Sequence, residues 1–150
     1  MKFILEVNNK TPQKVSKKTF LGVFKNTLEI ANFEFLKDKS IELSIALVSS
    51  DEIKTLNKDY RRKNKPTDVL SFGDFDKRDL LLAEAERADD IFLGEIILCP
   101  EYIAKNAQED NETFQYALNY ITSHGILHLM GFPHGKKMFT MQRNVADMLK

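Results

Sequence analysis

Hydrophobic and polar residues alternate in two short stretches of the chain, and this alternation predicts half-buried β-strands. The first stretch is Met1–Val7, where Phe3, Leu5 and Val7 fall on one side. The second contains Ile41, Leu43, Ile45 and Leu47. Two further apolar runs, Asp68–Phe72 and Phe92–Leu98, read as short strands. The pattern therefore predicts about four strands.

Apolar positions spaced by three and four residues predict helices in the first half of the chain. One helix is expected from about Pro12 to Leu36, with an apolar stripe of Leu21, Phe24, Leu28, Ala31 and Phe35. Ser49 and Glu52 have the spacing of a capping box, so a short helix is expected to begin there.

Three more helices are expected in the second half. Pro100 suits the first turn of a helix that runs to about Gln108. Asn111 is placed to cap a helix over Glu112–Met130, and Gly131 follows its end. A final helix carries Met138, Met141, Val145 and Met148. The polar segment Asp74–Asp90 is expected to be a loop.

These elements predict an α+β, mixed α/β fold in which about five helices pack on one small mixed sheet. The chain has 150 residues, of which 43% are hydrophobic and 29% charged, as in a globular domain. We expect residues 1–150 to form a single domain.

Composition narrows the setting in which the protein acts. Lys plus Arg and Asp plus Glu both number 22, so the net charge is zero, and we expect no duplex-DNA ligand. No apolar run approaches the length of a transmembrane helix, so no membrane role is expected. The first seven residues lack the features of a secretory signal. With a single cysteine, Cys99, the expected localisation is cytoplasmic.

All three histidines of the chain lie within eleven residues, His124–His134. His124 and His128 are four residues apart, so on a helix they project from one face. Beyond Gly131 the chain can turn and return His134 toward the same point. Three imidazoles give three ligands of a tetrahedral site and leave one vertex open. We therefore predict one Zn²⁺ ion, with Ni²⁺ or another divalent metal also possible.

The HxxxHxxGxxH spacing is also that of metzincin proteases, which need a glutamate directly after the first histidine as general base. That position is Gly125. A metzincin-like metalloprotease is therefore disfavoured. A hydrolase in which the ion activates water fits the ligands better.

Four segments resemble motifs of the YbeY family of metal-dependent endoribonucleases. His124–His134 matches the family pattern H-G-x-L-H-L-x-G-y-D-H except at Pro133, where the family has Asp. Leu56–Arg61 and Lys65–Phe72 are similar to the family's "LNxxYR" and "KPTDVLSF". Leu93–Ile96 is similar to its "LGDI", with Glu95 in place of the usual Asp.

The resemblance implies a cytoplasmic enzyme that cleaves single-stranded RNA in rRNA processing, including maturation of the 16S rRNA 3′ end, and in ribosome quality control. It implies that His124, His128 and His134 bind the metal and that Arg61 is important for catalysis. Ribosomal subunits or ribosome-associated proteins would be partners. The alternative from another class is a ribosome-associated assembly factor whose metal is structural.

Chemistry supports the same role for Arg61, because a guanidinium binds two oxygens of a phosphodiester at any working pH. Arg62, Lys63 and Lys65 follow in a basic stretch and could hold the flanking RNA backbone.

Overall fold

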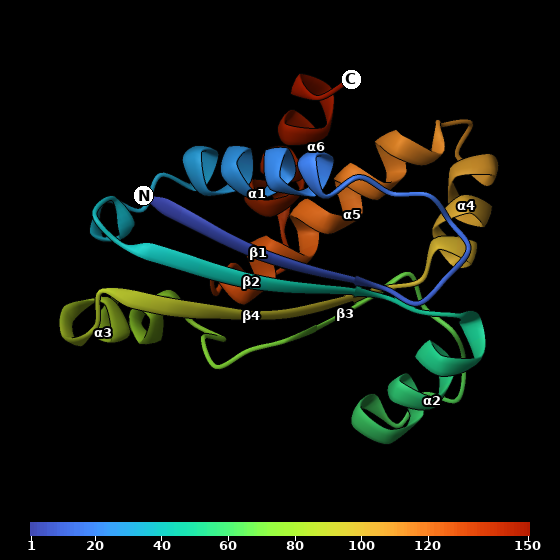
Figure 1. Cartoon of the computed structure of the whole chain (residues 1–150), viewed down its shortest axis with the longest axis horizontal. Helices are drawn as coiled ribbons and strands as arrows, with labels where there is room; N and C mark the ends of the chain where they lie inside the picture. The colour runs from blue at the N-terminus through green and yellow to red at the C-terminus, as the bar shows by residue number, and fades with distance from the viewer.

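A four-stranded sheet lies at the centre of the computed structural model, which describes residues 1–150 (Figure 1). The strands are β1 (Lys2–Asn9), β2 (Ser40–Leu47), β3 (Val69–Phe72) and β4 (Asp90–Leu98), in the order β1-β2-β4-β3. Strand β2 pairs in parallel with β1 and β4, whereas β3 pairs antiparallel with β4 at the edge. The predicted four strands and mixed sheet are confirmed.

Side-chain alternation along the strands separates two hydrophobic layers. Leu43, Ile45 and Leu47 of β2 point into the main core, and Ala46 points into a smaller cluster on the other face. In β4 the register shifts at Gly94, so that Leu93 and Ile96 both face the main core. A bulge in the strand accounts for this interruption of simple alternation.

Six α-helices surround the sheet. They are α1 (Lys17–Ala31), α2 (Ser50–Arg61), α3 (Arg78–Arg87), α4 (Pro100–Glu109), α5 (Phe114–Leu129) and α6 (Lys136–Met148), with a 3₁₀ turn η1 (Glu34–Leu36) after α1. Helices α1, α5 and α6 pack together over one face (Figure 1). Ile53 of α2 packs in the smaller cluster on the other face. The helices lack the combination of length and apolar composition needed to cross a bilayer.

The first helix is shorter than its apolar stripe predicts. The Ser16 hydroxyl accepts a hydrogen bond from the Thr19 backbone N–H at 3.4 Å, so the helix begins at Lys17 rather than near Pro12. It ends at Asn32, which has a left-handed backbone conformation with φ of 53°. The chain beyond that residue forms a separate turn, η1, whose Leu36 still reaches the core.

The expected loop at Asp74–Asp90 is wrong, because its centre forms helix α3. Leu81 and Ala85 of this helix are buried in the main core, while its charged residues are mostly exposed. The acidic composition concealed an amphipathic helix with only two fully buried positions. This helix raises the count from the expected five to six.

The start of α5 also differs from the prediction. Asn111 lies outside the helix in a left-handed conformation, with φ of 57°. Thr113 is the cap instead, and its hydroxyl accepts a hydrogen bond from the Tyr116 backbone N–H at 3.0 Å. The predicted end is confirmed, since α5 stops at Leu129 and Gly131 follows with φ of 91°.

Candidate metal centre

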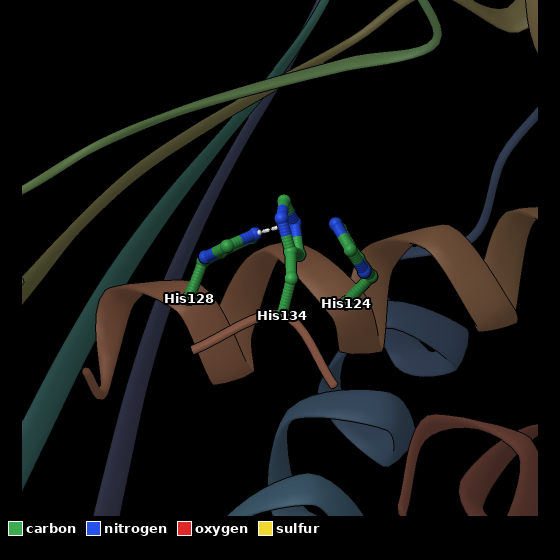
Figure 2. Close-up of side chains that lie close together, drawn as sticks. All are labelled: His124, His128 and His134. Atoms are coloured by element: carbon green, nitrogen blue, oxygen red, sulfur yellow. Dashed lines mark hydrogen bonds between the residues drawn. The ribbon is translucent and has the colours of Figure 1, made fainter. Parts of the chain in front are cut away.

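Helix α5 carries His124 and His128 on the same side, one turn apart, with ring centroids separated by 4.7 Å. His134 comes from the loop between α5 and α6, and its ring centroid lies 5.2 Å from that of His124 and 4.1 Å from that of His128. Figure 2 shows the three rings meeting above the helix. The structure thus brings together all three predicted ligands.

The turn that follows α5 returns His134 to the helix. Gly131 has φ of 91°, and a Cβ atom at this position would lie 2.5 Å from the backbone nitrogen of Arg78. Any other residue would therefore be strained and would also collide with the start of α3. The Gly131 N–H donates to the carbonyl of His128 at 3.0 Å, which closes the turn. The position of His134 depends on this tight turn at Gly131.

A buried glutamine orients the first histidine. Nδ1 of His124 lies 3.0 Å from Oε1 of Gln142, whose side chain on α6 is 1% exposed. Because a carbonyl oxygen can only accept, the imidazole donates its Nδ1–H and its Nε2 carries the free lone pair. That tautomer is the one a metal ligand needs.

Burial lowers the pKa of two of the three imidazoles. Desolvation lowers the pKa of His124, against the opposing effect of its hydrogen bond to Gln142. Desolvation, reinforced by repulsion from His124, His134 and Arg61, lowers the pKa of His128 to about 4. Both rings are therefore neutral near pH 7, as metal ligands must be.

The donor set fits a divalent cation. The three ligand nitrogens all lie within 4.8 Å of one another, and Nε2 of His128 is in direct contact with Nε2 of His134. Nitrogens that share one zinc ion lie about 3.4 Å apart, a spacing that small side-chain rotations would reach here. The cluster has three members, none of them a carboxylate or thiolate.

A cavity of about 550 Å³ opens in front of the histidines. Its polar lining, besides the three imidazoles, comes from residues of α2, β3 and the loop after β3: Tyr60, Arg61, Ser71 and Asp76. Arg61 is the last residue of α2, and its charge contributes to the low pKa of His128. The structure therefore unites the predicted arginine with the predicted ligands.

The other basic residues lie differently. Arg62, Lys63 and Lys65 are exposed in the loop that follows α2, and none lines the cavity. The side-chain amide of the buried Asn57 donates to the Lys65 carbonyl at 2.9 Å and holds this loop against α2. These residues can contact an RNA backbone only where it extends beyond the cavity.

Gly125 faces the sheet rather than the histidine cluster. A Cβ atom there would lie 3.0 Å from Cδ1 of Ile96 and 3.2 Å from Oγ of Ser71. The glycine lets α5 pack closely on β3 and β4, and a glutamate in its place would have to displace the side chains of Ile96 and Ser71. The protease alternative therefore lacks its base, at a position that packs tightly against the sheet.

Two site residues were not predicted from the sequence. Gln142 is a polar residue beside the apolar stripe of α6, and a polar residue in such a position is a detectable signal for a buried hydrogen bond. Asp76 lies in the segment interpreted as a loop, where no pattern connects its carboxylate to the cavity.

Comparison with known proteins finds that residues 6–150 match the model of the family described as endoribonuclease YbeY. The chain is 36% identical to endoribonuclease YbeY of Bacillus pumilus, over 98% of this chain and 95% of that protein. It is also 36% identical to endoribonuclease YbeY of Bacillus subtilis, over 78% and 77% of the two chains. A solution structure from Thermotoga maritima is similar, with a TM-score of 0.63, 30% identity, and coverage of 97% of this chain and 89% of that chain.

Proposed function

This chain belongs to the YbeY family of endoribonucleases, and we propose that it is a metal-dependent enzyme that cleaves single-stranded RNA. The observation that carries the proposal is the convergence of three imidazoles and one guanidinium on a single open cavity. The imidazoles can hold a cation, and the guanidinium can hold an anion beside it. A phosphodiester is an anion, so it can bind the metal cation and the guanidinium at the same time.

His124, His128 and His134 are the proposed ligands of one Zn²⁺ ion, and Ni²⁺ or another divalent metal would suit the same donors. When bound, such an ion supplies Lewis acidity to a phosphodiester oxygen and makes water a stronger acid. The protein contributes the orientation of the rings. Gln142 holds His124, and the Gly131 turn holds His134.

Arg61 is the proposed catalytic residue. As the bond at phosphorus breaks, negative charge grows on the phosphoryl oxygens, and a fixed guanidinium stabilises that charge. The side chain is exposed on the cavity side of α2, so it can reach a bound strand without rearrangement of the core. Arg62, Lys63 and Lys65 are proposed to contact the RNA backbone outside the cavity.

The family supports a more specific setting as part of the proposal. We propose that the substrate is rRNA, that the work includes maturation of the 16S rRNA 3′ end and ribosome quality control, and that ribosomal subunits or their associated proteins are partners. The protein would act in the cytoplasm, with residues 1–150 as one nuclease domain. An assembly factor with a structural metal is less well supported, because structural zinc sites have four protein ligands and this cluster has three.

Cleavage of matched RNAs tests the proposed activity. The zinc-loaded protein is incubated with a single-stranded RNA and with the same sequence in a duplex, and the experiment is repeated with His124→Ala. We expect cleavage of the single strand by the wild type and none by the variant. Equal cleavage by the variant would contradict the proposal.

A further inference from the structure

An exposed aromatic ring lies next to Arg61, the residue that we propose binds the substrate phosphate. Tyr60 precedes Arg61 in the last turn of α2, and both side chains line the cavity that contains the histidines. The Tyr60 side chain is 67% exposed, the largest exposed fraction among the exposed large hydrophobic residues. The buried residues of α2 are Ile53 and Asn57, so Tyr60 is not needed to attach the helix to the core.

The ring is nevertheless held in place. Tyr60 packs against Phe72 of β3 with ring centroids 5.1 Å apart and an angle of 65° between the planes. This edge-to-face contact positions the ring while leaving most of it uncovered. Phe72 also lines the cavity and is half-buried, so it is a firm support.

We propose that Tyr60 is the platform on which a nucleobase of the substrate stacks, next to the phosphate held by Arg61. The inference rests on the proposed nuclease function and adds a base-binding subsite to it. Every base has an aromatic face, so such a platform binds single strands without sequence preference. In a duplex both faces are covered by neighbouring base pairs, and the platform cannot be used.

The size and charge of the site agree with a nucleotide. The cavity of about 550 Å³ lies within the usual range of small-ligand pockets, about 300–1,000 Å³. Arg61 and Tyr60 line the same cavity, so one residue can bind a phosphate while the other contacts the base attached to the neighbouring sugar. The arrangement pairs a charged contact, which positions the backbone, with an aromatic one, which recognises unpaired bases.

Two variants distinguish the effect of the aromatic ring from that of an apolar side chain. Tyr60→Phe keeps the aromatic face, and Tyr60→Leu replaces it with an apolar side chain. Binding is measured with the zinc-loaded protein and a 2′-O-methyl octanucleotide that contains one 2-aminopurine, with the oligonucleotide checked for cleavage afterwards. We expect Tyr60→Leu to weaken binding by about 5- to 100-fold and to abolish the fluorescence quenching of 2-aminopurine at one position. Tyr60→Phe should remain within about twofold of the wild type.

A substrate change completes the test. Octanucleotides that lack the base at one position are compared, with each position tested in turn. For the wild type, loss of the base at one particular position should weaken binding. For Tyr60→Leu, loss of the base at that position should not weaken binding further. Equal binding and quenching by the wild type and Tyr60→Leu would overturn the platform and leave the nuclease function standing. If the wild type neither binds nor cleaves any RNA, the platform and the proposed function both fail.

Discussion

Nδ1 of His124 lies 3.0 Å from Oε1 of Gln142, so a buried amide on α6 determines which nitrogen of this imidazole faces the other two histidines. The contact joins the helix that carries two proposed ligands to the helix that follows the third. Partners of this kind commonly tune metal affinity because they fix both the tautomer and the ring angle. The His124–Gln142 pair therefore predicts an effect on metal binding from a residue that is not itself a ligand.

Replacement of Gln142 by leucine should weaken zinc binding by about 10- to 100-fold. The leucine removes the acceptor, leaving the Nδ1–H of His124 without a partner and the ring free to change tautomer. Competition with a chromophoric chelator measures the affinity. Gln142→Glu is the matched control, since a carboxylate still accepts the hydrogen bond, and it should retain zinc. Wild-type affinity in Gln142→Leu would show that the contact does not orient the ligand.

Arg61→Ala should lower the rate of RNA cleavage by about 100- to 1,000-fold, because one preorganised partner of the phosphoryl charge is lost. Arg61→Lys keeps the charge but not the planar fork, so we expect an intermediate rate. Zinc content, measured by elemental analysis, should be unchanged in both variants. Loss of metal together with activity would mean that Arg61 supports the fold of the site rather than the reaction.

Gly125→Glu should destabilise the protein by about 3 kcal/mol or more, because the new side chain meets Ile96 and Ser71 in a packed interface and buries a charge. Thermal or urea unfolding measures the loss. The same substitution recreates the sequence pattern of a zinc protease, so casein digestion serves as a second readout, and none is expected. A stable variant that digests casein would revive the protease interpretation.

Zinc binding should weaken as the pH falls, because protons compete with the ion for the imidazoles, and competition at His124 and His128 should begin only below the ordinary histidine pKa of about 6.5. A proton competes with the metal ion only at a pH low enough for the imidazole to be protonated. Burial lowers the pKa of His124 and brings that of His128 to about 4, so competition at these rings begins at lower pH. Equilibrium dialysis across this range gives the retention curve. Undiminished zinc retention at about pH 4 would contradict a site made of three imidazole ligands.

Much of the architecture follows from local patterns. Alternation predicted β1 and β2, and short apolar runs predicted β3 and β4. The capping pair Ser49 and Glu52 marked the start of α2, where the serine hydroxyl accepts from the Glu52 N–H at 3.2 Å. The histidine spacing predicted the cluster because helical periodicity alone brings two of the rings together. Gly131 then allows the turn that returns the third.

Long-range contacts explain what the patterns missed. Helix α3 was hidden because its stability comes from Leu81 and Ala85 packing in the main core, while most of its residues are polar. The pairing of His124 with Gln142 depends on how α5 and α6 pack, which no local pattern encodes. Placement of Tyr60 and Arg61 beside the histidines likewise depends on contacts between elements, such as the packing of Tyr60 on Phe72 of the edge strand β3.

The central claim is that one divalent ion is held by His124, His128 and His134 and is required for RNA cleavage. The most direct measurement combines elemental analysis with cleavage of a single-stranded RNA by wild type and His128→Ala, both purified in the same way. We predict one zinc or equivalent divalent ion per wild-type chain together with cleavage, and neither metal nor cleavage in the variant. A wild-type chain that cleaves RNA without bound metal, or a variant that keeps both, would contradict the claim.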